Sequence, residues 1–365
     1  MADIIGHFRK IDWLMVIAAL LLSLIGLVSI YSSSFFKQDF LNFKKQILFL
    51  IISVILMVVF SFFDWKLFRE NPYLILAFYF LNIFALLFLF FFAPTIKGTR
   101  GWFRIGLITI DPIEPFKIIL LILLAKYFSM RHIEMYNISH IFISGIYVFI
   151  PCFLIFLQPD LGSALILIFL WIGILLISGI EIRHFLLLIL IFFLVFSFSW
   201  NSILKEYQKE RIISFIFSDI EPLGSNWSAL QAEIAIGSGG FLGKGFRKGS
   251  QVQLGFLSVP QTDFIFSVIA EEFGFLGTIF LLFLFSILFF QIVNIAFYSK
   301  TNFPRLFAIG FATLFAIQIF VHIGMNLGIL PIVGISLPFV SYGGGGLISS
   351  YIALGILQSL RIKKD

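Results

Sequence analysis

The chain contains little charge and almost no cysteine. Only 12% of its 365 residues are Asp, Glu, Lys or Arg, while 60% are hydrophobic. This composition excludes a water-soluble globular protein, because its surface would have to be apolar. The single cysteine, Cys152, cannot form an intrachain disulfide. No His or Cys cluster has the spacing of a zinc site.

Internal repeats are also lacking, so a transporter built from inverted repeats gains no support. The net charge of +6 does not indicate binding to nucleic acid, because the basic residues flank apolar segments. We therefore expect no nucleic-acid partner.

Apolar segments of about 20 residues, the length of a membrane-spanning helix, dominate the chain, and the mean hydropathy is +1.08. The sequence predicts an all-α polytopic membrane protein with about ten transmembrane helices in a single domain, 1–365. The segment 264–297 exceeds one bilayer width, so its first part, through Glu271 and Glu272, is expected to form a partly buried entry before Gly274. The predicted spans are 13–32, 46–63, 73–93, 113–130, 139–157, 161–179, 184–200, 264–297, 305–327 and 345–361.

Lys and Arg in the short loops predict the orientation. They concentrate on the side of the N-terminus, so both termini are predicted to be cytoplasmic, in a multi-pass protein of the cytoplasmic (inner) membrane. Two longer segments on the other side, 94–117 and 201–263, are also basic. Positive charge that departs from the topology rule favours a functional role for these two segments.

The segment 201–263 is predicted to be a large extracytoplasmic loop between spans seven and eight. Its residues 202–218 mix Ile and Phe with Lys and Glu, which predicts an amphipathic helix on the membrane surface. The glycine-rich segment 237–245 fits either a flexible turn or a backbone that approaches a ligand closely. In the second interpretation Lys244 and Arg247 supply cations.

Asp263 closes this loop immediately before an apolar run. A carboxylate at the boundary between water and lipid costs on the order of several kcal/mol unless it is used. A functional site is therefore expected at Asp263, and the neighbouring basic loop suits an anionic substrate.

Several motifs resemble those of one family of membrane proteins. The most specific are IAIGSGGFLGKG, TDFIF with the following EEFG, and GILPIVGISLPFVSYGG. Shorter elements agree: Gly98 to Trp102, Pro112 with Glu114 and Lys117, and the QPDLG sequence that contains Asp160. Over nearly its whole length the chain resembles the SEDS family (shape, elongation, division and sporulation).

Within this resemblance, Pro331 to Gly334 is more similar to the elongation branch than to the division branch. The chain departs from the family's pattern where Val259 and Gln261 replace its usual Glu and His. It departs again at His322, where the family usually has Asn.

The resemblance implies a peptidoglycan glycosyltransferase that polymerises lipid II during cell-wall elongation and cell-shape maintenance. Asp263 would act as the general base on a sugar hydroxyl, and undecaprenyl pyrophosphate would be displaced with inversion. The active site would lie on the extracytoplasmic face. The expected substrate-binding residues are Arg100, Trp102, Arg104, Glu114, Lys117, Asp160, Lys244, Arg247, Gln251, Thr262 and Ser341.

No dedicated metal-binding residue is predicted. Mg²⁺ or Mn²⁺ could nevertheless share in neutralising the leaving diphosphate, through Asp263 or nearby acids. The resemblance also implies a partner, a single-span class B penicillin-binding protein that acts as a transpeptidase.

Alternatives remain for several of these residues. Glu114 and Lys117 are three residues apart, which fits a structural ion pair. Asp160 follows Pro159 at a predicted helix start and fits an N-cap, and Trp102 fits an interfacial anchor. His322 fits a satisfied core histidine. The alternative functions are a lipid II flippase and a non-catalytic scaffold for a transpeptidase. A flippase should have a polar path through the bilayer, yet the spans are nearly free of charge at mid-depth.

Overall fold

The computed structural model describes residues 2–36, 38–64, 71–92, 101–105, 108–130, 138–202, 209, 213 and 227–363. Within this part of the chain, ten apolar helices coincide with the ten predicted spans. Eight are long and apolar enough to cross a membrane, while α6 and α8 have 17 residues each. The predicted all-α polytopic membrane fold is confirmed. The helices are α2 (Trp13–Ser34), α3 (Leu41–Phe62), α5 (Pro72–Phe92), α6 (Ile113–Ser129), α7 (Ile138–Leu157), α8 (Leu161–Ile177), α9 (Ile182–Ser202), α13 (Ile265–Phe297), α14 (Asn302–Asn326) and α15 (Gly344–Ile362).

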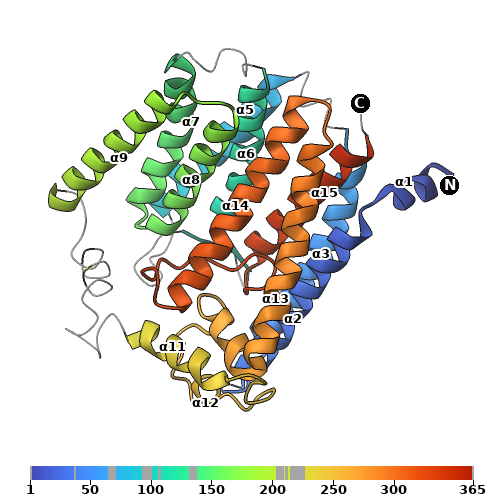
Figure 1. The fold of residues 1–365 in the computed structure, drawn as a ribbon, viewed down its shortest axis with the longest axis vertical. Coiled ribbons are helices and arrows are strands. Elements are labelled where there is room, and N and C mark those ends of the chain that lie inside the picture. The colour runs from blue at the N-terminus through green and yellow to red at the C-terminus, as the bar shows by residue number, and fades with distance from the viewer. Residues whose placement is uncertain are drawn as a thin grey trace.

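The long helices run side by side, and the two ends of the bundle differ (Figure 1). One end, here the Asp12 end, holds α1 (Ala2–Lys10), the start of α2 and the end of α15. The opposite end, here the Asp263 end, holds α11 (Trp227–Gly239), α12 (Ser250–Gln253) and the start of α13. α14 packs against α13, α6 and α8, and α15 packs against α3, so α14 is central to the bundle.

Helix α6, which packs against α14, is buried along most of its length. Leu120, Leu121, Leu124 and Ala125 are all 0% exposed, because α5, α8, α14 and α15 surround it. The packing of α6 places its start, which carries Glu114 and Lys117, at the Asp263 end.

The long helix α13 breaks at Gly274, whose φ of 64° is non-helical. This confirms the expected entry segment before Gly274. The glycine-rich segment packs against the break: a Cβ at Gly274 would lie 2.2 Å from the backbone nitrogen of Gly243, and Phe275 N–H donates to the carbonyl of Gly240 at 2.9 Å. The glycines therefore allow close approach to the backbone of α13, which gives the segment a defined packing. Its approach to a ligand stays a prediction.

Several elements were not predicted from the sequence. The antiparallel hairpin of β1 (Phe103–Ile105) and β2 (Ile108–Ile110) lies within the basic segment 94–117. α11 and α12 lie within the segment predicted as one large loop, and α11 packs against α13. The predicted amphipathic helix over 202–218 falls outside the described residues except at 202, 209 and 213.

Candidate functional site

Asp263 lies in the turn that immediately precedes α13. The next two residues, Phe264 and Ile265, are 1% and 0% exposed, whereas Asp263 is half-buried. The side-chain amide of Asn326, at the end of α14, donates to the backbone carbonyl of Asp263 at 2.8 Å. The turn is therefore held by the buried residues Phe264 and Ile265 on one side and by Asn326 of α14 on the other. The Asp263 side chain itself remains half-buried.

Residues 327–343, here the α14–α15 loop, pass beside this turn. A Cβ at Gly334 would lie 3.9 Å from Oδ2 of Asp263, so the loop backbone passes close to the carboxylate. The hydroxyl of Ser341 donates to the carbonyl of Thr262 at 2.8 Å. Two of the predicted substrate-binding residues, Thr262 and Ser341, are thus in contact, and Ser341 supports the turn that carries Asp263.

Gln261, which stands where the SEDS pattern has a His, ties the same turn to α2 and α3. Its side-chain oxygen accepts from the amide of Asn42 at 2.7 Å, and its amide donates to the hydroxyl of Ser34 at 3.2 Å. Its carbonyl accepts from the N–H of Tyr342 at 2.8 Å. In this chain, Gln261 therefore makes three hydrogen bonds that hold the turn before α13 in place.

A second polar cluster lies at the starts of α6 and α8. Nζ of Lys117 is 2.7 Å from Oε1 of Glu114, which confirms the structural ion pair. Asp160 is the N-cap of α8 and accepts from the N–H of Ser163 at 3.1 Å and from its hydroxyl at 2.7 Å, which confirms the N-cap. The roles of Glu114, Lys117 and Asp160 in binding substrate stay predictions.

Asp111 belongs to this cluster, although the sequence did not single it out. Burial, followed by the negative charge of Glu114, raises the pKa of Asp111 from 3.8 to about 8. Its Oδ1 accepts from the N–H of Ile113 at 2.9 Å. Burial and the nearby negative charge therefore both favour the protonated form of this carboxyl. In the sequence, an Asp two residues before a helix is typical of a helix cap. The raised pKa of Asp111 therefore could not be predicted from the sequence.

The α14–α15 loop borders both Asp263 and the second cluster. A Cβ at Gly162, in the first turn of α8, would lie 2.6 Å from the carbonyl oxygen of Val333. A Cβ at Gly346, in the first turn of α15, would lie 3.5 Å from Oε2 of Glu114. The candidate base and the cluster around Glu114 therefore lie along one shared loop.

The predicted cation Lys244 is matched by a buried acid. Its Nζ lies 2.8 Å from Oε1 of Glu271, which is 0% exposed. Glu271 also accepts from the N–H groups of Gln251 and Val252 at 2.9 and 3.2 Å, at the start of α12. Lys244 and the backbone of Gln251 are thus joined through Glu271, which orders the segment before α12. Contact of Lys244 and Gln251 with substrate stays a prediction.

Arg247 differs from Lys244, because its side chain is exposed at the Asp263 end. Its guanidinium carbon lies 3.2 Å from the ring centroid of Phe35, at the end of α2, in a cation–π contact. Its φ of 61° lies in the left-handed region. The aromatic contact holds the cation in place and leaves it available to an anionic group.

Three further predicted residues lie in or near the β hairpin. Trp102 is half-buried immediately before β1. The backbone of Arg104 pairs with Thr109 in the hairpin, and its side chain is not among those described. Arg100 lies outside the described residues. The substrate-binding roles of these three residues stay predictions.

Sequence reasoning missed Asn326. This fully buried residue accepts from the hydroxyl of Ser267 at 2.7 Å and donates to the carbonyls of Asp263 and His322, both at 2.8 Å. His322, one helical turn earlier, bonds through Nδ1 to the carbonyl of Ile335 at 2.7 Å. Its buried Nε2 has no hydrogen-bond partner among the described residues, so the expected satisfied core histidine is confirmed at one ring nitrogen only. The available signal was the four-residue spacing of His322 and Asn326, which places both on one face of an apolar helix.

Among the described residues, no three His, Cys, Asp or Glu side chains are grouped so that they could hold a metal ion. The involvement of Mg²⁺ or Mn²⁺ stays a prediction.

Residues 12–365 match the family model FtsW/RodA/SpoVE, described as cell cycle protein. The chain is 33% identical to stage V sporulation protein E of Bacillus subtilis, covering 96% of both chains. It is 32% identical to the peptidoglycan glycosyltransferase MrdB of Escherichia coli K12, covering 96% of this chain and 93% of that protein.

Solved structures show the same similarity. A chain from a peptidoglycan synthase complex, described for its coordination of polymerization and crosslinking, matches with a TM-score of 0.81 and 29% identity over 97% of this chain and 99% of that one. The rod shape determining protein RodA of Thermus thermophilus matches with a TM-score of 0.71 and 26% identity over 97% of each chain.

Proposed function

This chain belongs to the FtsW/RodA/SpoVE family and is a membrane peptidoglycan glycosyltransferase, and we propose that it polymerises lipid II with Asp263 as general base. The observation that carries the proposal is the placement of Asp263. It is a half-buried acid anchored by Asn326 and bordered by the α14–α15 loop.

The acceptor is a sugar hydroxyl, a poor nucleophile that needs a base within hydrogen-bond reach. Asp263 would take the hydroxyl proton as the oxygen attacks the anomeric carbon of the donor sugar. The bond from that carbon to the diphosphate oxygen breaks at the same time, which inverts the configuration. A single base suffices, because no covalent intermediate with the protein is formed.

The leaving group is a diphosphate that carries the polyprenyl chain. Cations can stabilise the developing charge in place of a general acid. Arg247, exposed and held over Phe35, is the described cation best placed for this role, and Arg100 and Arg104 are proposed to act with it. The Lys117–Glu114 pair and Asp160 would order the start of α6 and α8 on the other side of the α14–α15 loop.

A divalent cation would fit this reaction if the substrate diphosphate supplied most of its ligands. Mg²⁺ in proteins is often held by one or two carboxylates together with substrate phosphates. Asp263 and the acids near α6 and α8 are the side chains that would contribute. We propose such a cation as an auxiliary, which polymerisation assays with and without a chelator would test.

The proposed reaction takes place on the extracytoplasmic face, with both termini in the cytoplasm. The basic residues of the short loops support this orientation. We also propose a class B penicillin-binding protein as partner, since the similar peptidoglycan synthase complex is described as coordinating polymerization with crosslinking.

A lipid II flippase is less well supported. In the described spans, Asp, Glu, Lys and Arg occur only toward the two ends of each helix, as at Lys117 and Lys126 of α6 and at Arg305 of α14. A translocation path for a charged headgroup would need polar side chains at mid-depth.

Asp263→Asn tests the proposal in vesicles that contain lipid II. General bases contribute about 10²–10⁴-fold to rate, so glycan polymerisation should fall by at least about 100-fold while the protein stays folded. Asp39→Asn is the matched control, because Asp39 is an exposed acid at the same end whose oxygen accepts from Leu41 N–H, a bond that Asn can keep. Wild-type polymerisation by Asp263→Asn would refute the role of Asp263.

A further inference from the structure

Glu272 is a buried acid that the proposed reaction does not use. It lies in the first part of α13, two residues before the break at Gly274, and is 1% exposed. The hydroxyl of Ser32 on α2 donates a hydrogen bond to its carboxylate. The side-chain amide of Gln253 in α12 and the backbone N–H of Arg247 also donate to this carboxylate. Glu272 therefore joins α13 to α2, to α12 and to the segment before α12.

Glu272 differs from its neighbour Glu271 in the kind of partner it has. Glu271 is paired with Lys244, whose Nζ lies 2.8 Å from Oε1 of the acid. In the part of the chain that the structure describes, Glu272 forms no ion pair and bonds with a hydroxyl, an amide and a backbone N–H. Burial of a carboxyl group without a cation is costly, so the position of Glu272 indicates a role beyond packing.

Arg247, one of the partners of Glu272, lies in a tight turn. Lys248 N–H donates to the carbonyl of Gly245 at 3.0 Å, and Gly245 N–H donates to the backbone carbonyl of Glu272, also at 3.0 Å. Arg247 is the third residue of this turn and has a φ of 61°, where glycine or asparagine is usual. An arginine in this conformation is strained and persists only where its surroundings hold it. The Glu272 carboxylate, which accepts from Arg247 N–H, provides such support.

The side chain of Arg247 depends on the end of α2, which Glu272 also holds. The guanidinium carbon lies 3.2 Å from the ring centroid of Phe35, and Ser32 precedes Phe35 by about one helical turn. The amide of Gln253 donates to the carbonyl of Ser32 at 3.2 Å. Glu272 thus contacts both sides of the cation–π pair, namely the backbone of Arg247 and the helix that ends at Phe35.

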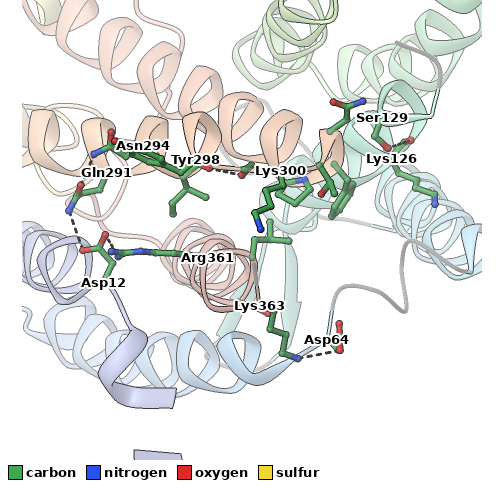
Figure 2. Close-up of a pocket in the computed structure, with 18 of the residues that line it drawn as sticks. Asp12, Asp64, Lys126, Ser129, Gln291, Asn294, Tyr298, Lys300, Arg361 and Lys363 are labelled. Carbon is green, nitrogen blue, oxygen red and sulfur yellow. Dashed lines mark hydrogen bonds and ion pairs between the residues drawn. The ribbon is translucent and has the colours of Figure 1, made fainter. Parts of the chain in front are cut away.

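The opposite end of the bundle shows another way in which an acid holds an arginine. In the cavity of about 490 Å³ at the Asp12 end, the carboxylate of Asp12 forms an ion pair with the guanidinium of Arg361 (Figure 2). That contact fixes the arginine but also neutralises its charge. Glu272 contacts Arg247 through the backbone, so it fixes the residue while the guanidinium lies over a neutral aromatic ring.

We propose that Glu272 is a positioning residue for the diphosphate-binding cation Arg247. The carboxylate holds the strained turn of Arg247 against the end of α2, so that the guanidinium stays over Phe35 in the orientation that binds the leaving diphosphate. A cation fixed in advance stabilises developing charge without the cost of reorganisation. The inference rests on the proposed function, in which Arg247 stabilises the diphosphate, and Glu272 acts only through Arg247.

The test measures binding of undecaprenyl diphosphate to the full-length, detergent-purified and delipidated protein by native mass spectrometry. Undecaprenol, which has the same chain and no phosphate, is the comparison ligand. Arg247→Gln should weaken undecaprenyl diphosphate binding at least about tenfold, because hydrogen bonds from a charged donor contribute about that much. Glu272→Ala should weaken it by a similar factor, although the guanidinium is still present. Neither substitution should change the binding of undecaprenol.

Combining the two substitutions in one chain separates positioning from an independent effect. If Glu272 acts through Arg247, the double variant should bind undecaprenyl diphosphate about as weakly as Arg247→Gln alone, because the effects of coupled residues do not add. Losses that multiply to about 100-fold would overturn the proposal, since independent sites behave in that way. An equal loss of undecaprenol binding in Glu272→Ala would also overturn it, because general damage to the fold would then explain the result.

Ser32→Ala tests the same role in a chain that keeps Glu272, and it decides the question if Glu272→Ala does not fold. It removes one hydroxyl that donates to Glu272 and should weaken undecaprenyl diphosphate binding about fivefold, the contribution of a typical hydrogen bond. Ser33→Ala is the matched control, because Ser33 is the next residue of α2, is also buried, and donates to the carbonyl of Ile30 of its own helix at 3.0 Å. It should leave binding unchanged, and equal losses in the two serine variants would contradict the proposal.

The same measurements distinguish failure of this inference from failure of the proposed function. If Arg247→Gln weakens undecaprenyl diphosphate binding while Glu272→Ala and Ser32→Ala bind it as the wild type does, the role of Arg247 stands and the inference is wrong. If Arg247→Gln itself binds undecaprenyl diphosphate normally, the role of Arg247 in the proposed function is refuted and the inference is refuted with it.

Discussion

Asn326 at the end of α14 donates a hydrogen bond to the backbone carbonyl of Asp263, at 2.8 Å. This bond joins the central helix of the bundle to the turn that carries the candidate base. Asn326 also accepts from the backbone N–H and the hydroxyl of Ser267, at 3.3 and 2.7 Å, so one amide ties together α14, α13 and the turn that precedes α13. The position of the Asp263 carboxylate therefore depends on a buried residue that need not touch the substrate.

Asn326→Ala should lower polymerisation by at least about tenfold, because small displacements of a base weaken proton transfer strongly. The free energy of unfolding should also fall, by about 1–3 kcal/mol, since Ser267 loses its acceptor. Ser267→Ala is the control: it removes one bond to Asn326 and keeps the bond to Asp263. Lipid II polymerisation and thermal unfolding would be measured for both variants. Equal loss of activity in the two would show that Asn326 acts through stability alone.

The Lys244–Glu271 pair permits a test that separates structure from substrate binding. Removing one partner of a buried ion pair is strongly destabilising, by about 3–5 kcal/mol in fully buried cases, and somewhat less here because Lys244 is 28% exposed. Lys244→Met should therefore reduce both stability and polymerisation.

The double variant Lys244→Met with Glu271→Gln removes both charges and keeps an acceptor for Gln251 N–H. If Lys244 only balances Glu271, the double variant should recover most of the activity lost in Lys244→Met. If Lys244 binds the diphosphate, activity should stay low while the melting temperature recovers. Measurement of both quantities on the same preparations decides between the two roles.

The raised pKa of Asp111 predicts a pH dependence of stability. In the unfolded chain the carboxyl releases its proton near pH 3.8, whereas in the folded protein it holds the proton to about pH 8. Between these values the folded state binds more protons, so stability falls as pH rises. Asp111→Asn keeps the acceptor for Ile113 N–H and removes the titration. Its melting temperature should decline less than that of the wild type between pH 5 and 9, while Asp39→Asn should follow the wild type. Parallel curves for Asp111→Asn and wild type would contradict the burial of an unpaired charge.

Gly274→Ala should be among the most destabilising single substitutions. A left-handed φ costs a non-glycine residue about 1–2 kcal/mol, and the new Cβ would also meet the backbone of Gly243 at 2.2 Å. Gly237→Ala in α11 is the control, because no atom lies within 4 Å of its added Cβ and alanine favours a helix. Thermal unfolding should separate the two variants clearly; similar melting temperatures would show that the break in α13 does not require glycine.

The fold was largely predictable because apolar length is a strong signal in a membrane protein. All ten predicted spans correspond to helices, even α6, where Lys117 and Lys126 interrupt the apolar pattern near its ends. The β hairpin and α11 were missed, because their sequences are neither long nor periodic and their formation depends on neighbouring segments.

The candidate site was less predictable than the fold. The charge of Asp263 beside an apolar run singled it out as a candidate, whereas Glu114, Lys117 and Asp160 became candidates through the resemblance of their motifs to the SEDS family. The sequence did not assign Asn326, because its four-residue spacing from His322 indicates a shared helix face but not the contact with the carbonyl of Asp263, which depends on the folded chain. It also left the glycine-rich segment open, since glycine permits close approach to a ligand or to the protein's own backbone, and the packing of Gly243 against α13 is visible only in the folded chain.

The α14–α15 loop has a consequence for the biogenesis of the enzyme. It touches α8 at Gly162 and lies beside Asp263, and α15, which follows it, brings Gly346 next to Glu114. During synthesis these earlier parts enter the membrane well before residues 327–343 emerge from the ribosome. A nascent chain that already contains Asp263 therefore lacks the α14–α15 loop and α15 that border the site. We expect polymer synthesis to begin only after α15 is inserted.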